Sequence, residues 1–554
     1  MRHDETEESD MAHANASPQA NGSAEIDEFD AIVVGAGLSG VYLLHRLRKL
    51  GLSVRVLEAG TDVGGTWYWN RYPGARCDTE SMFYAYSWPT ELRQKWTWTS
   101  RYPDQDEIQG YISHVTDEFD LRKDIQFETR VAGATFDEAT NRWAITTEQG
   151  ETFSARFCVM ATGCITKPNL PDWPGVESFE GDTYHTARWP KDDVDFTGKH
   201  VAVVGTGSTG IQAIPMIAKQ AEQLTVFQRT PNYAIPAWNG PLDPEHEREV
   251  KDNYDKYWDM ARWSSTGLMY EVRDRSVFED TEDVRELEFE DRWQQGGFSF
   301  LFAYKDILTD RNANELVAEF VRNKIRGRVD DPETAELLCP NTHPFASKRL
   351  CVDTNYYETY NRDNVTLVNV RKTPIEEMTS TGLRTSDESH ELDAIIFATG
   401  FDSMTGALFN IDIRGRSGEK LKEKWADGPR TYLGLGTAGF PNLFTITGPG
   451  SPSVISNMMT SIEQHVDWVS DCIEHLVQEG MQTIEPRVDA EDDWVEHVNE
   501  VANTTLFPEA DSWYTGANVP GKPRIFTPYV GGVGTYRKKC DEVAANGYEG
   551  FVLA

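Results

Sequence analysis

The sequence has few features of a secreted, membrane-spanning or metal-binding protein. Only seven cysteines occur among its 554 residues, and they are scattered, without the C-x-x-C or Cys/His spacings typical of metal sites. No apolar run approaches the roughly 18 residues that cross a bilayer, and the N-terminus lacks the basic-then-apolar order of a secretory signal. We therefore expect a cytoplasmic protein with reduced, mostly buried thiols, no metal site and no membrane association.

Basic residues are also scarce. Lys and Arg number 53 against 90 Asp and Glu, which gives a formal net charge of -37. Such a surface repels phosphate backbones, so we expect no nucleic-acid partner. The excess is larger than solubility requires, and it leads to the hypothesis that the protein is halophilic, adapted to a cytoplasm whose cations screen self-repulsion. The sequence does not reveal the oligomeric state, and a monomer is the default expectation.

A complete strand, loop, helix and strand unit follows the first residues. The run Asp30-Ala-Ile-Val-Val-Gly-Ala-Gly-Leu-Ser-Gly40 precedes an amphipathic stretch and a second apolar strand that ends at Glu58. Gly35 permits a tight turn, Gly37 lets a pyrophosphate approach the backbone, and Gly40 allows close packing. The helix N-terminus favours phosphate charge, and Glu58, 18 residues past Gly40, can accept hydrogen bonds from a ribose. These features predict a dinucleotide site.

The same pattern recurs in the second quarter of the chain, where the strand begins at His200. At the position of the first unit's acid this unit has Arg229 and Thr230, 19 and 20 residues past the last glycine. An acid there would repel a 2′-phosphate, whereas a guanidinium binds one through charge-assisted hydrogen bonds. The second unit therefore predicts a site that binds NADP rather than NAD. Its expected loop residues are Gly205, Gly207, Ser208, Thr209 and Gly210.

Two sites of opposite electrostatic preference fit a permanently held FAD and an NADPH that delivers hydride. A duplicated fold with one inactive site is the alternative. Two apolar stretches, 157–163 and 394–400, each end in Ala-Thr-Gly, a turn at which a chain leaves a dinucleotide-binding sheet. We therefore expect an α/β fold of two interleaved Rossmann-like domains. The expected parts are a disordered acidic leader (1–27), an FAD-binding domain (28–165 and 392–554), an NADP-binding domain (166–239 and 336–391) and a helical insertion (240–335).

A further motif lies between the two glycine loops. Phe179-Glu-Gly-Asp-Thr-Tyr-His-Thr-Ala-Arg-Trp-Pro190 matches the pattern F-x-G-x-x-x-H-x-x-x-W-P, which is typical of type I Baeyer–Villiger monooxygenases. With the flanking loops in the right order, the chain resembles this family, and is most similar to its phenylacetone monooxygenase branch. His185 taken alone could be a linker histidine. By resemblance it couples NADP binding to domain placement. The motif residues are Phe179, Gly181, His185, Trp189 and Pro190.

The resemblance extends over nearly the whole chain after the leader. Segment 64–78 is similar to the family's flavin-contacting segment, and 398–402 to its second flavin-domain motif. Segment 512–522 resembles the C-terminal segment that closes over the cofactors, and 448–457 a loop of the substrate pocket. The resemblance implies cofactor contacts from Gly65, Thr66, Trp67, Asp78, Tyr84 and Trp513, and substrate contacts from Ser453, Val454, Ile455 and Met458.

The family's reaction converts ketones to esters or lactones with NADPH and O2 through a C4a-peroxyflavin. The protein must keep the peroxide anionic and polarise the ketone oxygen, a task that suits a permanently cationic, fork-shaped donor. By resemblance, Lys348 holds the NADP 2′-phosphate, while Arg349 stabilises the peroxide and the Criegee intermediate. Asp78 then sets the position of Arg349. Without the resemblance, Lys348 and Arg349 would be read as a charged surface pair.

Three alternatives remain open. A flavin-containing monooxygenase that oxidises nitrogen or sulfur has a similar motif but lacks the Trp189-Pro190 dipeptide, and sulfoxidation is also expected here as a side activity. A dithiol-disulfide reductase needs two neighbouring cysteines beside the flavin, whereas Cys158 and Cys164 are six residues apart. A non-enzymatic NADP-binding scaffold would leave every catalytic position idle. The sequence does not choose among ketones, because selectivity depends on pocket shape.

Overall fold

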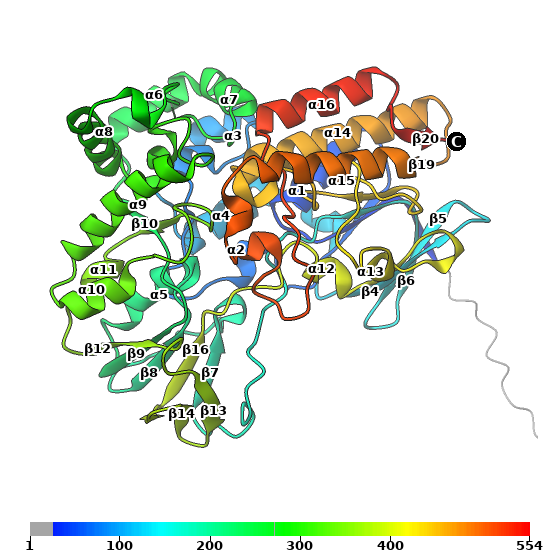
Figure 1. Cartoon of the computed structure of the whole chain (residues 1–554). Coiled ribbons are helices and arrows are strands. Elements are labelled where there is room, and N and C mark those ends of the chain that lie inside the picture. Colours follow the sequence, from blue (N-terminus) through cyan, green and yellow to red (C-terminus); the bar gives the residue numbers. More distant parts are fainter. Residues whose placement is uncertain (1–25, 271) are drawn as a thin grey trace, which may run out of the picture.

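The computed structural model describes residues 26–270 and 272–554. The expected leader therefore lies outside the described residues, except for its last two positions, because strand β1 already begins at Asp27. Figure 1 shows two sheets lying apart, with helices covering the upper side of the molecule. Within the described ranges, no helix combines the length and the hydropathy that a membrane crossing requires.

The larger sheet has eight strands in the order β17-β4-β5-β6-β1-β2-β3, with β18 paired to β6. Strands β1, β2 and β6 run parallel, and helix α1 (Leu38–Lys49) connects the first two. The last four residues of β1 are buried, because both faces of this central strand are covered. The strands are β1 (Asp27–Val34), β2 (Val54–Leu57), β3 (Ile125–Gln126), β4 (Val131–Asp137), β5 (Arg142–Thr147), β6 (Thr152–Met160), β17 (Asp412–Arg414) and β18 (Leu443–Thr445).

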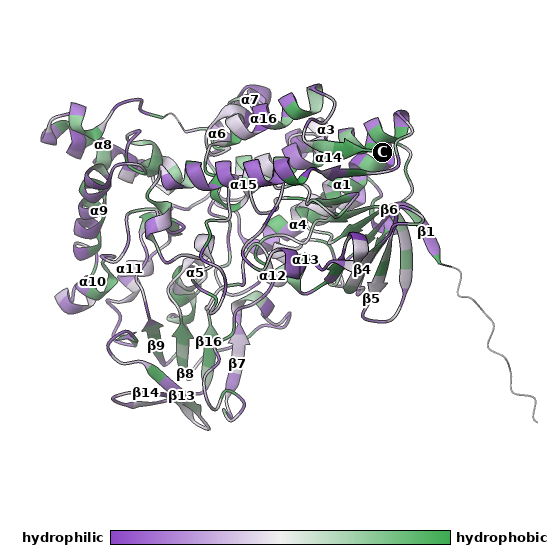
Figure 2. Ribbon diagram, turned by 45° about the vertical axis from the view of Figure 1, so that its right-hand side comes forward, coloured by the Kyte–Doolittle hydropathy of each residue, from purple (hydrophilic) through white to green (hydrophobic). Residues whose placement is uncertain are grey.

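The second sheet is parallel throughout, in the order β12-β9-β8-β16-β7. Helix α5 (Ser208–Ile217) connects β8 to β9, and Figure 2 shows hydrophobic residues concentrated in the central strands. The α/β fold with two Rossmann-like units is thus confirmed. The strands are β7 (Asp182–His185), β8 (His200–Val204), β9 (Gln223–Gln228), β12 (Val365–Asn369) and β16 (Ala394–Phe397), and β13 (Ile375–Thr379), β14 (Gly382–Thr385) and β15 (Ser389–Glu391) form an antiparallel sheet beside them.

One expected domain boundary is wrong. Residues from 392 onward were assigned to the FAD-binding domain, but β16 pairs with β8 and β7 in the second sheet, with Phe397 opposite both Val204 and His185. The reason is that the Ala-Thr-Gly turn occurs once in each sheet, and the motif alone does not say to which sheet its strand belongs. The chain returns to the first sheet only after this strand, at β17.

The helices gather around the two sheets. In the first domain, α14 packs against α1 and α16, and the short strands β19 (Ile484–Pro486) and β20 (Phe551–Leu553) pair beside them. Strands β10 (Ala234–Pro236) and β11 (Cys351–Asp353) pair next to the second sheet. The helices of these two regions are α2 (Thr66–Trp69), α3 (Thr90–Lys95), α4 (Gln105–Glu118), α11 (Tyr356–Thr359), α12 (Gly406–Phe409), α13 (Leu421–Lys424), α14 (Met458–Gln478), α15 (Val488–Asn503) and α16 (Val533–Ala545).

Segment 240–335, expected to be a helical insertion, contains helices that extend from the top down the left side of Figure 1. They are α6 (Pro244–Asp252), α7 (Tyr254–Trp263), α8 (Glu282–Gln295), α9 (Arg311–Arg326) and α10 (Pro332–Leu338), with a 3₁₀ segment at Gly297–Phe302. Phe289, Trp293 and Phe300 pack in the apolar core of the second domain, whereas Tyr254 and Trp258 of α7 pack in that of the first domain.

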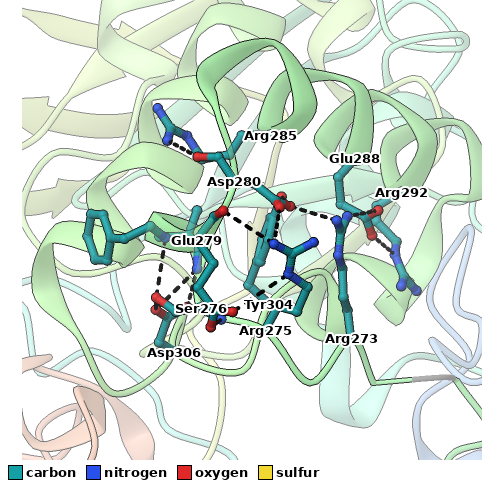
Figure 3. A network of polar contacts seen from close by, with 12 residues as sticks. Arg273, Arg275, Ser276, Glu279, Asp280, Arg285, Glu288, Arg292, Tyr304 and Asp306 are labelled. Carbon is teal, nitrogen blue, oxygen red and sulfur yellow. Dashed lines mark hydrogen bonds and ion pairs between the residues drawn. The ribbon is translucent and has the colours of Figure 1, made fainter.

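A network of charged side chains, drawn in Figure 3, holds this insertion together. At its centre the carboxylate of Asp280, only 4% exposed, is 2.6 Å from Arg273 and 2.9 Å from Arg275. The same carboxylate accepts a hydrogen bond of 2.8 Å from the Tyr304 hydroxyl. Since a buried carboxylate must be paired to be tolerated, the network fixes the segment before α8 against the 3₁₀ segment and the residues that follow it.

All seven cysteines lie in the described part of the chain, where they are buried and form no disulfide. The expectation of reduced, buried thiols is thereby confirmed. Burial raises the pKa of each of the two that stand six residues apart, Cys158 and Cys164. Neither thiol is therefore poised as the thiolate that a disulfide reductase needs.

Buried histidines make the fold sensitive to acid. Burial lowers the pKa of His465 to about 3, and its Nδ1 accepts a hydrogen bond of 2.8 Å from the Thr447 backbone N–H. A lowered pKa means that this stability is complete above the unfolded-state pKa near 6.5 and is lost as the pH falls toward 3. His343 and His185 behave alike, with pKa values lowered to about 3 and about 4.

We therefore expect the free energy of unfolding, measured by urea denaturation, to fall as the pH is lowered from about 6.5 to 4, by about 1.4 kcal/mol per pH unit for each such histidine. His465→Asn keeps a hydrogen-bond acceptor but has no titrating ring. Its free energy of unfolding should depend less steeply on pH by about one proton. An unchanged slope in this variant would show that His465 does not contribute.

Candidate functional site

One large cavity of about 1370 Å³ lies between the two sheets and is lined by both glycine loops. Its wall contains Gly35 and Gly37 from the first loop and Gly205 and Gly207 from the second. The two dinucleotide sites predicted from separate parts of the sequence therefore open into a common space. A hydride donor bound at one loop and its acceptor bound at the other would share this cavity.

The two loops have the same backbone design. Gly35 and Gly205 have φ values of +105° and +109°, which favour glycine. A Cβ at Gly35 would lie 2.7 Å from the carbonyl oxygen of Ala161, and one at Gly205 would lie 2.5 Å from that of Ala398. Each Ala-Thr-Gly turn thus packs directly on the glycine loop of its own sheet. This close packing accounts for the recurrence of the turn in both sheets.

The last glycines of the loops allow close packing, as predicted. A Cβ at Gly40 would lie 1.9 Å from the Gly35 carbonyl oxygen, and one at Gly210 would lie 2.2 Å from that of Gly205. Gly207 differs, because nothing lies within 4 Å of the position of its Cβ. That space faces the N-terminus of α5, where backbone N–H groups and the helix dipole favour a phosphate group. The loop therefore fits a pyrophosphate.

Glu58 is almost fully buried at the end of β2, at 4% exposure. Its carboxylate oxygens accept hydrogen bonds of 2.7 Å from the backbone N–H groups of Ala36 and Gly60. Burial raises the pKa of this carboxyl, and the two backbone bonds oppose the shift. Glu58 also lines the cavity. It therefore holds the first glycine loop in shape while leaving lone pairs available to a ribose, a second role that the sequence did not predict.

Four residues at the second loop form a cationic cluster. Arg229 and Thr230 stand at the end of β9, and Lys348 and Arg371 approach from other segments. Lys348 Nζ donates a hydrogen bond of 2.6 Å to the Asp511 carbonyl oxygen, and Arg371 Nη2 donates one of 3.0 Å to Thr230 Oγ1. Among the described residues, Arg229 has no carboxylate partner. In the described part of the chain no ion pair joins these three cations to a carboxylate, although the charge of Asp511 acts on Lys348, and such a cluster favours a phosphate ligand.

The charge of Lys348 is tuned by its surroundings. Burial and the neighbouring Arg229 lower the pKa of its ammonium to about 8. Because Lys348 is charged below this pKa, any contribution that it makes to binding a 2′-phosphate would be complete below pH 8 and lost as the pH rises. We expect the Kd for NADPH to rise about tenfold between pH 7 and 9.5, as measured by fluorescence titration. Lys348→Arg, which stays charged, should flatten this rise; an equal rise in the variant would contradict the assignment.

Arg349 and Asp78 form a paired unit on the cavity wall. Arg349 Nε and Nη2 donate to the carboxylate of Asp78 at 2.8 to 3.0 Å, and Nη1 donates to the Val454 carbonyl oxygen at 2.8 Å. Both side chains are 23% exposed and line the cavity. The guanidinium carbon also lies 4.9 Å from the centre of the Phe298 ring. Asp78 raises the pKa of Arg349 above its ordinary value, against the effect of burial.

The motif between the loops builds the edge of the second sheet. His185 is the last residue of β7, its Nδ1 accepts a hydrogen bond of 3.0 Å from the Ala187 N–H, and its Nε2 lies 3.4 Å from Thr399 Oγ1. Burial lowers its pKa to about 4. Thr399 follows the residue that packs on the second glycine loop, so His185 is joined to that loop through one side chain. Because both residues belong to the second sheet and the turn after it, the link does not test the coupling role, which stays a prediction.

The other motif residues serve packing. Trp189 is buried, with its ring 5.2 Å from that of Tyr184 and 6.2 Å from that of Phe196. A Cβ at Gly181 would lie 2.5 Å from the Phe179 ring. Pro190 directly follows Trp189 and is exposed.

The predicted flavin-contacting residues also face the cavity. Trp67 Nε1 donates a hydrogen bond of 3.1 Å to the Tyr84 hydroxyl, next to the Arg349–Asp78 pair. Asn518 Nδ2 donates one of 2.6 Å to the Phe401 carbonyl oxygen, which docks the C-terminal segment on the turn after β16. The predicted cofactor residues that line the cavity are Gly35, Gly37, Glu58, Gly65, Thr66, Trp67, Asp78, Tyr84, Gly205, Gly207, Ser208, Thr209, Arg229, Thr230, Lys348 and Trp513.

The predicted substrate residues divide into two groups. Val454 and Met458 line the cavity beside Arg349, as expected, and Ile462 from the next turn of α14 joins them. The prediction is wrong for Ser453, which is fully buried with its hydroxyl 3.2 Å from Cys164 Sγ. Ile455 also lies away from the cavity, against an apolar cluster around Phe507. The physical reason is that residues 453–455 form a 3₁₀ turn, so consecutive side chains point in different directions.

Three wall or cluster residues were missed. Phe298 stacks on Arg349 from the helical insertion. Arg371 completes the cationic cluster. Arg188 lines the cavity with its guanidinium 4.6 Å from the Trp69 ring. Arg188 occupies a variable position of the motif, and its charge next to a cofactor domain was a usable signal; no sequence signal pointed to the other two.

Comparison with known proteins identifies the family. A family model described as flavin-binding monooxygenase-like matches residues 30–238. The chain is 44% identical to an acetone monooxygenase (methyl acetate-forming) of Gordonia sp. (strain TY-5), over 95% of this chain and 99% of that protein. It is also 44% identical to a phenazine N-monooxygenase of Lysobacter antibioticus, over 95% of this chain and 96% of that protein.

A solved structure gives the same result. The structure of an oxidised steroid monooxygenase bound to NADP is 51% identical to this chain, with a TM-score of 0.91 over 95% of this chain and 99% of that one. Formation of methyl acetate from acetone, named for the first relative, inserts an oxygen beside a ketone, which is a Baeyer–Villiger oxidation. On sequence, fold and loop arrangement together, the chain belongs to the flavin-binding monooxygenases of the type I Baeyer–Villiger family.

Proposed function

We propose that this protein is an FAD- and NADPH-dependent Baeyer–Villiger monooxygenase that uses O2 to convert ketones to esters or lactones. The observation that carries the proposal is the Arg349–Asp78 pair, held on the wall of a cavity that both glycine loops also line. A ketone oxygenase needs a fixed positive charge at the place where flavin, nicotinamide and ketone meet. The relatives' names and the bound NADP of the steroid monooxygenase support this assignment.

The residues fit both cofactors. The first loop with Glu58 would hold the pyrophosphate and ribose of FAD, and segment 64–78 would contact its ring system. The second loop would hold the pyrophosphate of NADPH, for which the space beside Gly207 is open. Arg229, Lys348 and Arg371 would pair with the 2′-phosphate. When bound, FAD reduced by NADPH supplies the activation of O2 that the reaction requires.

Arg349 would stabilise the negative charge that develops on the ketone oxygen. Its guanidinium stays protonated at every working pH, since Asp78 raises its pKa, and it offers several N–H donors in one plane. Asp78 accepts from two of its nitrogens, and the Val454 carbonyl fixes a third. The donor is therefore oriented before substrate arrives, which lowers the reorganisation needed in the transition state.

Apolar side chains beside this donor would exclude water from the reacting atoms. Val454, Met458 and Ile462 line the cavity next to Arg349, and Phe298 covers one face of the guanidinium. Charge–charge and charge–dipole interactions are stronger in such a wall than in water. The same residues give the ketone pocket a mostly aliphatic surface, which suits a medium-sized apolar ketone.

Phe298 should act as a positioning residue for Arg349. A cation over an aromatic face gains about 0.5 to 2 kcal/mol, so we expect Phe298→Leu to lower kcat for ester formation by about 3- to 30-fold. More NADPH should then be consumed per ester formed, as measured by oxygen uptake and product yield. Phe298→Tyr keeps the ring and should retain the parent coupling. Equal losses in the two variants would assign the residue to packing alone.

The proposal is tested by the products of the purified holoprotein. Incubation with NADPH, O2 and a panel of cyclic, aryl and aliphatic ketones should give esters or lactones, identified by mass, with one oxygen atom from ¹⁸O2. Oxidation of NADPH without any ketone-dependent ester, across the whole panel, would reject it.

N- or S-oxidation is the second candidate. It is supported by the phenazine N-monooxygenase, which is as similar in identity as the acetone monooxygenase. Two observations favour ketone chemistry. The Trp189-Pro190 dipeptide is present. The oriented Arg349 would serve a developing ketone oxyanion, whereas transfer of oxygen to an amine develops no such charge. Sulfoxidation is proposed only as a side activity and does not discriminate between the two candidates. Formation of N-oxides without any ester would favour the second candidate.

A further inference from the structure

A second cleft, of about 620 Å³, lies away from the glycine loops, where α1, α3, α7, α14 and α16 meet. Figure 1 shows α7 and α16 side by side at the top of the molecule, and these two helices are also in contact in the structure. We call this space the arginine cleft, because Arg46, Arg93, Arg262 and Arg537 line it. None of the residues predicted from sequence to bind cofactor or substrate belongs to its lining.

Two of these arginines are already paired. Arg46 of α1 lies 2.6 Å from Asp471 and 3.6 Å from Asp467, both of α14. Arg93 of α3, which is buried, lies 2.5 Å from Asp255 of α7. These ion pairs join the helices that form the walls of the cleft, and they involve three of the four aspartates that line it.

The other two arginines lack a carboxylate. Arg262 of α7 donates a hydrogen bond of 3.0 Å to Ser87 Oγ, and in the described part of the chain no ion pair joins it. Arg537 of α16 has neither a hydrogen bond nor an ion pair among the described residues, and its Nε is buried without a partner. Burial, and next the charge of Arg262, lower the pKa of Arg537. Two neighbouring guanidiniums therefore face the cleft without an ion pair, and the charges of Asp541, Asp467 and Glu463 oppose only part of the lowering at Arg537.

This arrangement is costly unless an anion relieves it. Like charges in a partly desolvated site repel each other more strongly than they would in water. Carboxylates are plentiful in a chain with 90 Asp and Glu, yet the one remaining aspartate of the lining, Asp541, forms no ion pair with either arginine. The cationic cluster at Arg229 shows the same pattern, in the place where the family binds the 2′-phosphate of NADP.

We propose that the arginine cleft is a binding site for an oxyanion, a phosphate or carboxylate group that pairs with Arg262 and Arg537. Guanidinium groups recognise both oxyanions through charge-assisted hydrogen bonds. Trp88 and Trp468 also line the cleft, so an apolar part of the ligand would lie against indole rings. The proposal is independent of the reaction assigned to the main cavity.

Helix α14 contributes residues to both the arginine cleft and the main cavity. Helix α14 begins at Met458, which lines the main cavity together with Ile462. Further along the same helix, Gln464 and Asp467 line the arginine cleft. A bound oxyanion would thus contact a helix that also forms part of the wall beside Arg349.

The test is calorimetric titration of the holoprotein at constant ionic strength with inorganic phosphate and, separately, with benzoate. NADP is kept saturating so that its 2′-phosphate occupies the cluster at Arg229. We expect saturable binding of at least one anion, with a Kd raised at least tenfold in both Arg262→Gln and Arg537→Gln. Arg248→Gln, which removes an exposed charge on α6, is the matched control and should leave the Kd unchanged.

The outcomes separate clearly. Flavin content and melting temperature verify that each variant is folded. Binding of phosphate alone would identify a phosphate site, and binding of benzoate alone a carboxylate site with an aromatic contact. The proposal is overturned if neither anion binds saturably at concentrations up to about 20 mM. It is equally overturned if both arginine variants bind as tightly as the control.

Discussion

Replacement of Arg349 by alanine is expected to lower the rate of ester formation by about 10³-fold. Loss of an oriented donor to a developing oxyanion lowers a rate by about 10²- to 10³-fold. The upper end of this range is expected because the lost donor is also charged. Reduction of the flavin by NADPH should remain nearly normal, since the NADP contacts are assigned to Lys348 and Arg229. Stopped-flow absorbance measures reduction, and gas chromatography measures the ester. The split between the two half-reactions is the signature of the assignment.

The variant also leaves Asp78 without its partner. Its carboxylate is 23% exposed and loses the hydrogen bonds from Arg349, so some loss of stability accompanies the substitution. The double variant Asp78→Ala, Arg349→Ala removes the unpaired charge and serves as the control for folding. The double variant should make no more ester than the low amount made by Arg349→Ala. Ester formation at the parental rate in Arg349→Ala would remove the main support for the proposed mechanism.

The parts of the site that repeat a local pattern were predictable from sequence. Gly35, Gly40 and Glu58 lie within a single strand, loop, helix and strand unit, and their roles follow from chain geometry alone. The same holds for the second loop and for Arg229 at its end. Such patterns are recognisable because their residues lie close together in the chain at fixed spacings, even where the contact that requires a glycine, such as that of Gly35 with Ala161, comes from a distant segment.

Contacts between distant segments were harder to predict. Strand β16 was placed in the wrong sheet because its closing turn is the same in both sheets. Only its hydrogen bonds to β8 show that it belongs to the second sheet. Phe298 reaches Arg349 from an insertion more than fifty residues away. Its ring is held there by packing in the apolar core of the second domain. This packing leaves no pattern in the sequence, since any aromatic residue of the insertion could have filled the position.

The direction of side chains in irregular segments could not be predicted from the sequence either. Resemblance to the family located the loop around residue 454 correctly, but Ser453 points into the core and Val454 toward the cavity. A 3₁₀ turn rotates successive side chains by about 120°. A prediction that treats the three residues of this turn as one wall is therefore right only for Val454.

The second large effect is expected at the cationic cluster. The double variant Arg229→Ala, Lys348→Ala should lower kcat/KM for NADPH by about 10²- to 10³-fold, because each hydrogen bond to a charged group contributes about 1.5 to 3 kcal/mol and neighbouring contributions are not fully additive. With NADH, which lacks the 2′-phosphate, kcat/KM should change less than about threefold. The enzyme would then lose most of its preference for NADPH.

The comparison between the two cofactors decides the role of the cluster. Equal losses with NADPH and NADH would mean that the substitutions disturb the second loop itself rather than a phosphate contact. Arg371 offers an independent check, since it is tied to Thr230 and was not part of the sequence prediction. Arg371→Ala alone should lower NADPH efficiency about tenfold and leave NADH efficiency unchanged. The three cations come from three separate segments of the second domain, so a shared effect on NADPH alone requires that all of them meet the same phosphate.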